Sequence, residues 1–246
     1  MRIIDTHVHL GMSKFSGVDT TEEGILHSME SNQVEACLVM PQPTLDDVSK
    51  VHERIFRFTK QYPGKIFGMA SIDPWLSDEE FDRHVSLYLG QYRFKAIKLH
   101  PMGHNISPLS PLCDKVYEAA RRYRVPVLIH TGLGIPFSFP SLAVEPARRF
   151  SDVRFVLCHA GFAVYTDEAI VAAKLCENIV LEPSWCPTYA VSKMIDNVGI
   201  DRMIMGSDHL NNLPVELAKW KALNLSENQL EQVFFYNPND LFQLHL

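Results

Sequence analysis

The sequence lacks the features that mark several classes of protein. No stretch approaches the ~18 consecutive apolar residues of a membrane-spanning helix, and the N-terminus has no signal-peptide pattern. The net charge is −6, and no basic run is longer than an arginine pair. The sequence therefore lacks the basic patch that is typical of nucleic-acid-binding proteins. The five cysteines are scattered without Cys-x-x-Cys pairing. We therefore expect a cytoplasmic protein with reduced thiols and with neither a nucleic acid nor a membrane as partner.

Short apolar runs alternate with longer amphipathic stretches along the whole chain. The runs that predict strands cover residues 2–9, 34–40, 66–72, 94–100, 125–130, 153–159, 178–182 and 202–208. The stretches that predict helices cover residues 21–32, 45–62, 77–89, 109–123, 141–150, 165–176, 188–198, 214–222 and 226–235. Ser77 and Ser226 each begin a predicted capping box, and Gly90 predicts a helix end.

This alternation predicts an α/β fold in which parallel strands are joined by right-handed crossovers. Eight such units in 246 residues match a (β/α)₈ TIM barrel, a parallel eight-stranded closed barrel formed by one domain over residues 1–246. A doubly wound open sheet is the alternative. It is disfavoured because no Gly-x-Gly-x-x-Gly loop follows any predicted strand.

The first predicted strand ends in a His-x-His pair, His7 and His9. Because side chains alternate along a strand, the two imidazoles share one face about 6–7 Å apart, with Asp5 beneath them. Such a spacing suits the binding of one metal ion. Taken alone, the pair is more often an ordinary feature of a surface strand.

Other predicted strands also end in residues that bind metals or transfer protons. The strand-end residues are His7, His9, His100, His130, His159 and Asp208. In a barrel of this type the strand ends meet at one mouth, where the active site lies. One such histidine could be a satisfied core residue, but a set of this size at one mouth indicates a site.

The chemistry that suits this set is a single divalent metal ion. We expect His7, His9, His130 and Asp208 to bind it and to leave one position for water. Zinc is the expected ion, with manganese as the alternative. Metal-bound water has a pKa of about 7 and can therefore lose a proton at neutral pH. Asp208 would also act as the base that accepts this proton. His159 would donate a hydrogen bond to the substrate oxygen that gains negative charge.

In the order of these residues the chain resembles the amidohydrolase superfamily, and its amidohydrolase-related branch in particular. The motifs that carry the resemblance are Ile-Ile-Asp-Thr-His-Val-His (3–9), Ile-Lys-Leu-His-Pro (97–101), Gly-Ser-Asp (206–208) and Asn-Pro-Asn-Asp-Leu-Phe (237–242). The resemblance implies a metal-dependent TIM-barrel enzyme with His7, His9, His130 and Asp208 as ligands. It also implies that His159 lies near the reacting oxygen.

Four further residues are candidates for substrate binding: Lys98, His100, His104 and Trp185. Lys98 and His100 share a strand face and could bind an anionic group. Some branches of the superfamily carbamylate a lysine on this strand to bridge two metals, and an ion pair with Asp5 or Glu182 is the structural alternative for Lys98. His209 should point away from Asp208, because neighbouring residues of a strand face opposite sides.

We expect a hydrolase that cleaves a carbon–nitrogen, ester or lactone bond of a small molecule. A metal-dependent lyase, either a non-oxidative decarboxylase or a hydratase, is the alternative, and a barrel that binds metal without turnover is the third reading. The decarboxylases that the chain resembles are longer, and the predicted mouth loops here contain little arginine. The expected partner is a small-molecule substrate, and the sequence is compatible with a homodimer.

Overall fold

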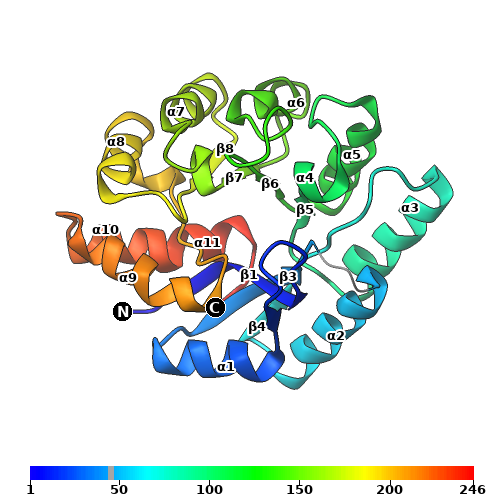
Figure 1. Ribbon diagram of the computed structural model, residues 1–246, viewed down its shortest axis with the longest axis horizontal. Coiled ribbons are helices and arrows are strands. Elements are labelled where there is room, and N and C mark those ends of the chain that lie inside the picture. Colours follow the sequence, from blue (N-terminus) through cyan, green and yellow to red (C-terminus); the bar gives the residue numbers. More distant parts are fainter. Residues whose placement is uncertain (44–46) are drawn as a thin grey trace.

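The computed structural model describes residues 1–43 and 47–246 of the chain. Figure 1 shows strands gathered at the centre and helices arranged around them. One sheet has the order β2-β1-β3-β4 and the other β5-β6-β7-β8. The parallel strands are β1 (Ile4–Met12), β3 (Ala36–Pro41), β4 (Ile66–Gly68), β5 (Ile97–Leu99), β6 (Val127–His130), β7 (Phe155–Cys158) and β8 (Ile179–Glu182). The short β2 (Asp19–Thr20), which the sequence did not predict, pairs antiparallel with β1.

Isolated bridges connect the two sheets. Ala70 pairs with Ile97 between β4 and β5, and the segment 203–208 forms bridges through Met203 to β8 and through Asp208 to β1. The predicted parallel α/β arrangement is confirmed. The described residues do not form a continuous eight-stranded sheet, because the predicted eighth strand makes only single bridges.

The Asp5 side chain explains the irregular pairing at this point. Its carboxylate accepts hydrogen bonds from the backbone N–H groups of His7 and Ser207 and from the Ser207 hydroxyl. Two backbone donors are thereby satisfied by a side chain instead of by the ladder, and the β1–β3 register shifts between Asp5 and Val8. The result is a tight junction between β1 and the segment that ends in Asp208.

The predicted helices are present with altered ends. The α-helices are α1 (Glu22–Ser31), α2 (Val48–Gln61), α3 (Asp78–Val85), α4 (Pro101–His104), α5 (Asp114–Tyr123), α6 (Val144–Arg149), α7 (Thr166–Leu175), α8 (Thr188–Val198), α9 (Leu213–Ala222), α10 (Glu227–Glu231) and α11 (Asn237–Leu241). Shorter 3₁₀ turns are η2 (Pro111–Cys113), η3 (Pro140–Ala143), η4 (His159–Gly161), η5 (Ile200–Arg202) and η6 (Leu210–Asn212), and the wider π turns are η1 (Ser86–Gln91) and η7 (Gln232–Tyr236). Residues 45 and 46, the expected start of the second helix, lie outside the described residues.

One predicted helix end differs from the structure, and the two predicted N-terminal caps are present. The helix expected to end at Gly90 continues as η1 through Gln91, because Gly90 packs beside Tyr123 in the helical conformation instead of reversing the chain. Ser226 forms the complete reciprocal capping box with Gln229. Ser77 caps α3 by accepting from the Glu80 N–H.

The apolar side chains form an inner and an outer cluster. The inner cluster draws on all eight predicted strands, and Phe235, Phe242 and Leu244 from the C-terminal segment pack into it. Alternation along the strands separates the clusters: on β6, Leu128 faces inward while Val127 and Ile129 face the helices. The inner cluster therefore fills the centre of the ring, and the buried histidines of the candidate site lie where the strands end.

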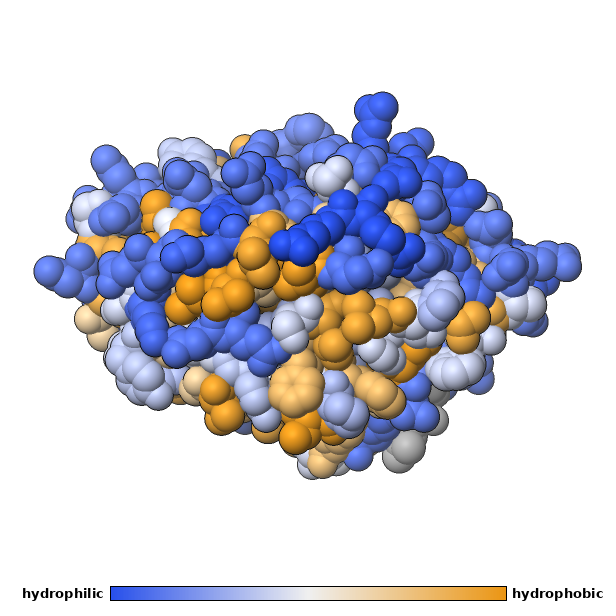
Figure 2. Space-filling model, turned by 90° about the horizontal axis from the view of Figure 1, so that it is seen from above, coloured by the Kyte–Doolittle hydropathy of each residue, from blue (hydrophilic) through white to orange (hydrophobic). Residues whose placement is uncertain are grey.

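On the face seen from above, apolar residues gather across the middle and lower part, while hydrophilic residues cover the upper part (Figure 2). Among the described residues, no helix combines the length and apolarity needed to cross a bilayer.

Candidate metal centre and its surroundings

Three predicted ligands meet at the end of β1. His7 Nε2 lies 3.1 Å from His9 Nε2, and Asp208 Oδ1 lies 3.3 Å from each of these two nitrogens. Both histidines are buried, whereas the Asp208 side chain is 26 % exposed. Three metal-ligating atoms therefore converge on one small volume that opens to solvent on the Asp208 side.

Hydrogen bonds behind the histidines determine which ring nitrogens face this volume. His7 Nδ1 donates to Glu182 Oε2 over 2.8 Å, and His9 Nδ1 donates to the Pro41 carbonyl over 3.0 Å. Each neutral ring then has its lone pair on Nε2. Two imidazole lone pairs and a carboxylate oxygen that face one another repel unless a cation lies among them. The residues present therefore fit a divalent metal ion.

Asp208 is held in place by a tight backbone turn and by contacts with distant parts of the chain. It has a φ of 65°, in the left-handed region, and its N–H donates to the His7 carbonyl over 2.7 Å. The indole N–H of Trp185 donates to Asp208 Oδ2 over 2.8 Å. Oδ1 is thus left to face the two histidines. The tight turn reverses the direction expected for a regular strand, and His209 lines the mouth with Asp208 instead of pointing away from it.

His130, the fourth predicted ligand, is adjacent but does not converge with the other three. Its Nε2 donates to the Leu133 carbonyl over 2.9 Å, so its lone pair is on Nδ1. The ring stacks on His100 with centroids 4.3 Å apart and meets His159 edge-on at 4.8 Å. A ligand role for His130 stays a prediction.

His159 belongs to a buried chain of hydrogen bonds. Its Nδ1 lies 2.7 Å from Ser184 Oγ, and Ser184 in turn donates to Glu182 through both its hydroxyl and its backbone N–H. Glu182 therefore connects His159 and His7. Sequence reasoning treated Glu182 only as a partner for Lys98. The sequence feature that could have identified Glu182 as a site residue is its position at the end of the apolar run that forms β8.

The four residues predicted to bind substrate lie in different places. Lys98 is deeply buried, and its Nζ lies 3.1 Å from His7 Nε2 and 3.3 Å from Cys158 Sγ. It is not within ion-pair distance of Asp5 or Glu182. In this arrangement the Lys98 ammonium donates to the His7 lone pair, so a metal ion would displace that hydrogen bond.

The other three line the cavities at the mouth. His100 precedes α4, and its Nδ1 accepts from the Gly103 N–H. His104 Nε2 lies 3.3 Å from Ser71 Oγ, in a cavity beside the mouth. Trp185 is partly exposed, and its ring stacks against Phe162.

The mouth itself is a cavity of about 590 Å³ above the three convergent ligands. It is lined by His9, Ser13, Phe15, Ser16, Gln42, Pro43, His100, Met102, His130, Leu133, His159, Phe162, Trp185, Asp208 and His209. The described residues in this lining include no lysine or arginine. The cavity therefore suits a small, partly aromatic or acyl compound whose reacting group is uncharged.

Burial controls the protonation of the site. It lowers the pKa of His7 and His159 well below the usual value and that of His130 to about 4, so these rings are neutral at pH 7. Burial also raises the pKa of Glu182 to about 7. Burial acts to raise the pKa of Asp208, but the surrounding imidazoles of His159, His7 and His9 hold it well below the usual value.

A protein-family model described as Amidohydrolase matches residues 46–244. The chain belongs to the amidohydrolase family. The match begins after β1, so the His7–His9 pair lies outside it. No curated protein matches the sequence.

Solved structures similar to this member of the amidohydrolase family cover nearly all of its chain. A TIM-barrel protein from Bordetella bronchiseptica has a TM-score of 0.82 at 17% identity, covering 99% of both chains. A 5-carboxyvanillate decarboxylase from Novosphingobium aromaticivorans, complexed with manganese and 4-hydroxy-3-methoxy-5-nitrobenzoic acid, has a TM-score of 0.76 at 13% identity, covering 98% of this chain and 96% of that one. A dihydroorotase from Campylobacter jejuni has a TM-score of 0.66 at 17% identity, covering 98% of this chain and 83% of that one. At these identities the likeness concerns the fold.

Proposed function

We propose that this chain is a metal-dependent hydrolase with a (β/α)₈ barrel that cleaves a carbon–nitrogen, ester or lactone bond of a small molecule. The observation that carries the proposal is the convergence of His7 Nε2, His9 Nε2 and Asp208 Oδ1 within 3.3 Å of one another. Two nitrogens and a carboxylate oxygen suit zinc and also manganese, the ion bound by the similar decarboxylase. A divalent ion held there would lower the pKa of a water molecule and polarise a carbonyl oxygen.

Asp208 is the proposed base. Its low pKa keeps it ionised at neutral pH, and Trp185 holds Oδ2 while Oδ1 faces the reacting volume. It can accept the proton released by the attacking water and pass it to the leaving group. Its partial exposure lets that proton exchange with solvent after each turnover.

His159 is proposed to contact the substrate oxygen. When the Ser184 hydroxyl turns toward His159 Nδ1, Nε2 carries the proton and donates to the oxygen that gains negative charge. When the hydroxyl turns toward Glu182, Nε2 is the lone pair and can accept a proton instead. The Ser184 rotor thus couples the two roles to the buried carboxylate.

A lyase is the second candidate, because a decarboxylase is among the similar structures. The lining of the mouth argues for hydrolysis, since the described residues there provide no lysine or arginine for a reacting carboxylate. Carbon dioxide release from aromatic and unsaturated acids would favour the lyase. Incorporation of oxygen-18 from labelled water into the product acid would favour the hydrolase.

The test combines metal analysis with two variants. We expect about one zinc or manganese ion per chain and turnover on a panel of esters, lactones and cyclic amides. Asp208→Asn should lose at least about 10²-fold in kcat, as expected when a general base is removed. Asp196→Asn, an exposed carboxylate on α8, is the matched control and should behave like the native protein. Full turnover by carefully metal-free protein would overturn the proposal.

A further inference from the structure

A second cavity, of about 290 Å³, adjoins the mouth. Gln42, Pro43 and His100 line both cavities, so they form the partition between them. We call the second cavity the side pocket. Its other lining residues are Lys14, Pro41, Val48, Ser49, His52, Ser71, Ile72, Asp73, Leu76, His84, Tyr88, Lys98, Gly103 and His104. The side pocket therefore lies directly beside the mouth.

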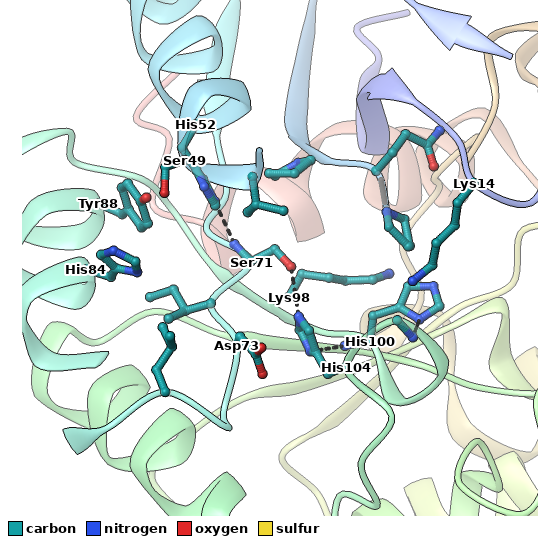
Figure 3. Close-up of a pocket in the computed structure, with 17 residues that line it drawn as sticks. Lys14, Ser49, His52, Ser71, Asp73, His84, Tyr88, Lys98, His100 and His104 are labelled. Atoms are coloured by element: carbon teal, nitrogen blue, oxygen red, sulfur yellow. Dashed lines mark hydrogen bonds between the residues drawn. The ribbon is translucent and has the colours of Figure 1, made fainter. Parts of the chain in front are cut away.

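The side pocket differs from the mouth in its charge. Lys14 and Lys98 both line it, and in Figure 3 both side chains extend toward the region of His100. Within the described parts of the chain, neither lysine has a carboxylate oxygen at ion-pair distance. The contacts of Lys98 Nζ are His7 Nε2 and Cys158 Sγ, and this side chain is only 1% exposed. A carboxylate in the side pocket would therefore meet two basic side chains that form no ion pair within the described residues.

Several other polar groups of the side pocket already have hydrogen-bond partners. His52 accepts from the Ser71 N–H, and His104 hydrogen-bonds to the Ser71 hydroxyl. Asp73, the one acidic residue among the described residues of the lining, is exposed and accepts from the Trp75 N–H. Lys14 and Lys98 therefore remain the candidate partners for an anionic group in the side pocket.

We propose that the side pocket binds a carboxylate of the substrate, with Lys14 and Lys98 as its counter-charges. The inference deepens the proposed hydrolase activity: the substrate would be a half-ester or half-amide of a small dicarboxylic acid. The uncharged carbonyl of the substrate would lie in the mouth, which has no lysine or arginine in its described lining. The carboxylate of the substrate would lie in the side pocket. The apolar side chains of Val48, Ile72 and Leu76 provide a surface for the connecting methylene groups.

Lys14 is the residue to change, because it is exposed on the loop after β1 and its removal should leave the core intact. Its N–H donates to the Pro43 carbonyl, which holds the loop at the rim of the side pocket. Lys14→Met keeps the length of the side chain and removes the charge. Lys174→Met, on the exposed last turn of α7, changes net charge equally and is the matched control.

The first measurement compares two esters of equal chain length, 4-nitrophenyl hemiglutarate and 4-nitrophenyl pentanoate. Native protein should prefer the hemiglutarate in kcat/KM by about 10- to 100-fold, the range for hydrogen bonds to a charged group. The preference should fall to about three-fold or less in Lys14→Met and persist in Lys174→Met. A native ratio near one, with both esters hydrolysed, would overturn the side pocket while the hydrolase stands.

The second measurement does not depend on turnover. Glutarate is titrated into native protein and both variants by calorimetry, and Lys14→Met should weaken its binding about 10-fold or more. If neither these esters nor the panel of esters, lactones and cyclic amides reacts but this difference is found, the carboxylate site stands and the proposed hydrolase fails. Equal glutarate affinity in native and Lys14→Met protein, equal weakening in both variants, or no glutarate binding would overturn the carboxylate site.

Discussion

Replacing Glu182 with glutamine tests whether the buried carboxylate behind His7 controls metal binding. Glu182 Oε2 accepts from His7 Nδ1 over 2.8 Å and from the Ser184 hydroxyl over 3.1 Å. Oε1 accepts from the Ser184 N–H over 2.8 Å. Glutamine has nearly the same shape but only one acceptor oxygen. Its NH₂ group must therefore face either the His7 ring or the Ser184 N–H, both of which are donors.

The size of the effect follows from this conflict. One buried donor loses its acceptor, which costs about 1–3 kcal/mol. If the loss falls on His7, the ring gains by moving its proton to Nε2, where it blocks the metal-binding lone pair. We therefore expect the metal dissociation constant to rise about 10- to 100-fold, as is typical when an outer partner of a ligating histidine is changed. Removal of a buried charge offsets part of the cost to folding, so metal affinity should change more than stability.

Competition with a chromophoric chelator measures the affinity for Zn²⁺ and Mn²⁺ at pH 8, where Glu182 is ionised. Glu79→Gln, an exposed position on α3, serves as control. Because burial raises the pKa of Glu182 to about 7, native protein should approach the weaker variant as the pH falls below 7. A Glu182→Gln affinity within about two-fold of native at pH 8 would refute the reasoning.

Three further changes test other parts of the structure. Burial lowers the pKa of His52 to about 3. A histidine in the unfolded chain has a pKa of about 6.5, so below that pH the unfolded chain binds a proton that the folded chain does not. Urea unfolding should therefore show that the native protein loses about 2 kcal/mol of stability between pH 7 and 5 and that His52→Gln does not lose it. Equal pH slopes in the two proteins would contradict this. Trp185→Phe keeps the ring but loses the hydrogen bond to Asp208, and metal affinity should weaken about five-fold, for ~1 kcal/mol at a partly exposed site; unchanged affinity would show that the indole does not position the carboxylate. Gly206→Ala places a Cβ 2.6 Å from His7 Cβ, so thermal unfolding should show a loss of about 1–3 kcal/mol, and a native-like melting temperature would refute this close packing.

Part of the candidate site could be predicted because the residues of one strand keep their relation in any fold. His7 and His9 are two residues apart on β1, and their shared face follows from the geometry of a strand. Asp208 follows an apolar run, and strand ends in a parallel α/β fold lie at a common edge. Local pattern and the order of the strands therefore carried the prediction that these three side chains meet.

The remaining details depend on contacts between distant segments. Glu182 and His7 are 175 residues apart, and nothing local marks their hydrogen bond. Asp5 disrupts the ladder by binding Ser207 across the junction, so the eighth strand forms only single bridges. His130 turns its Nε2 to a loop carbonyl, a choice made by the loop that packs over it.

The sequence by itself determined the alternation of elements, the inward apolar faces and the positions of the strand-end histidines, because each of these depends on local spacing. Only the tertiary structure decided which ring nitrogens carry lone pairs, where Lys98 places its ammonium, and that a lysine-lined pocket adjoins a mouth with no lysine or arginine in its described lining. The physical reason is that hydrogen-bond partners and counter-charges are chosen in space, among groups that the chain brings together only when it folds.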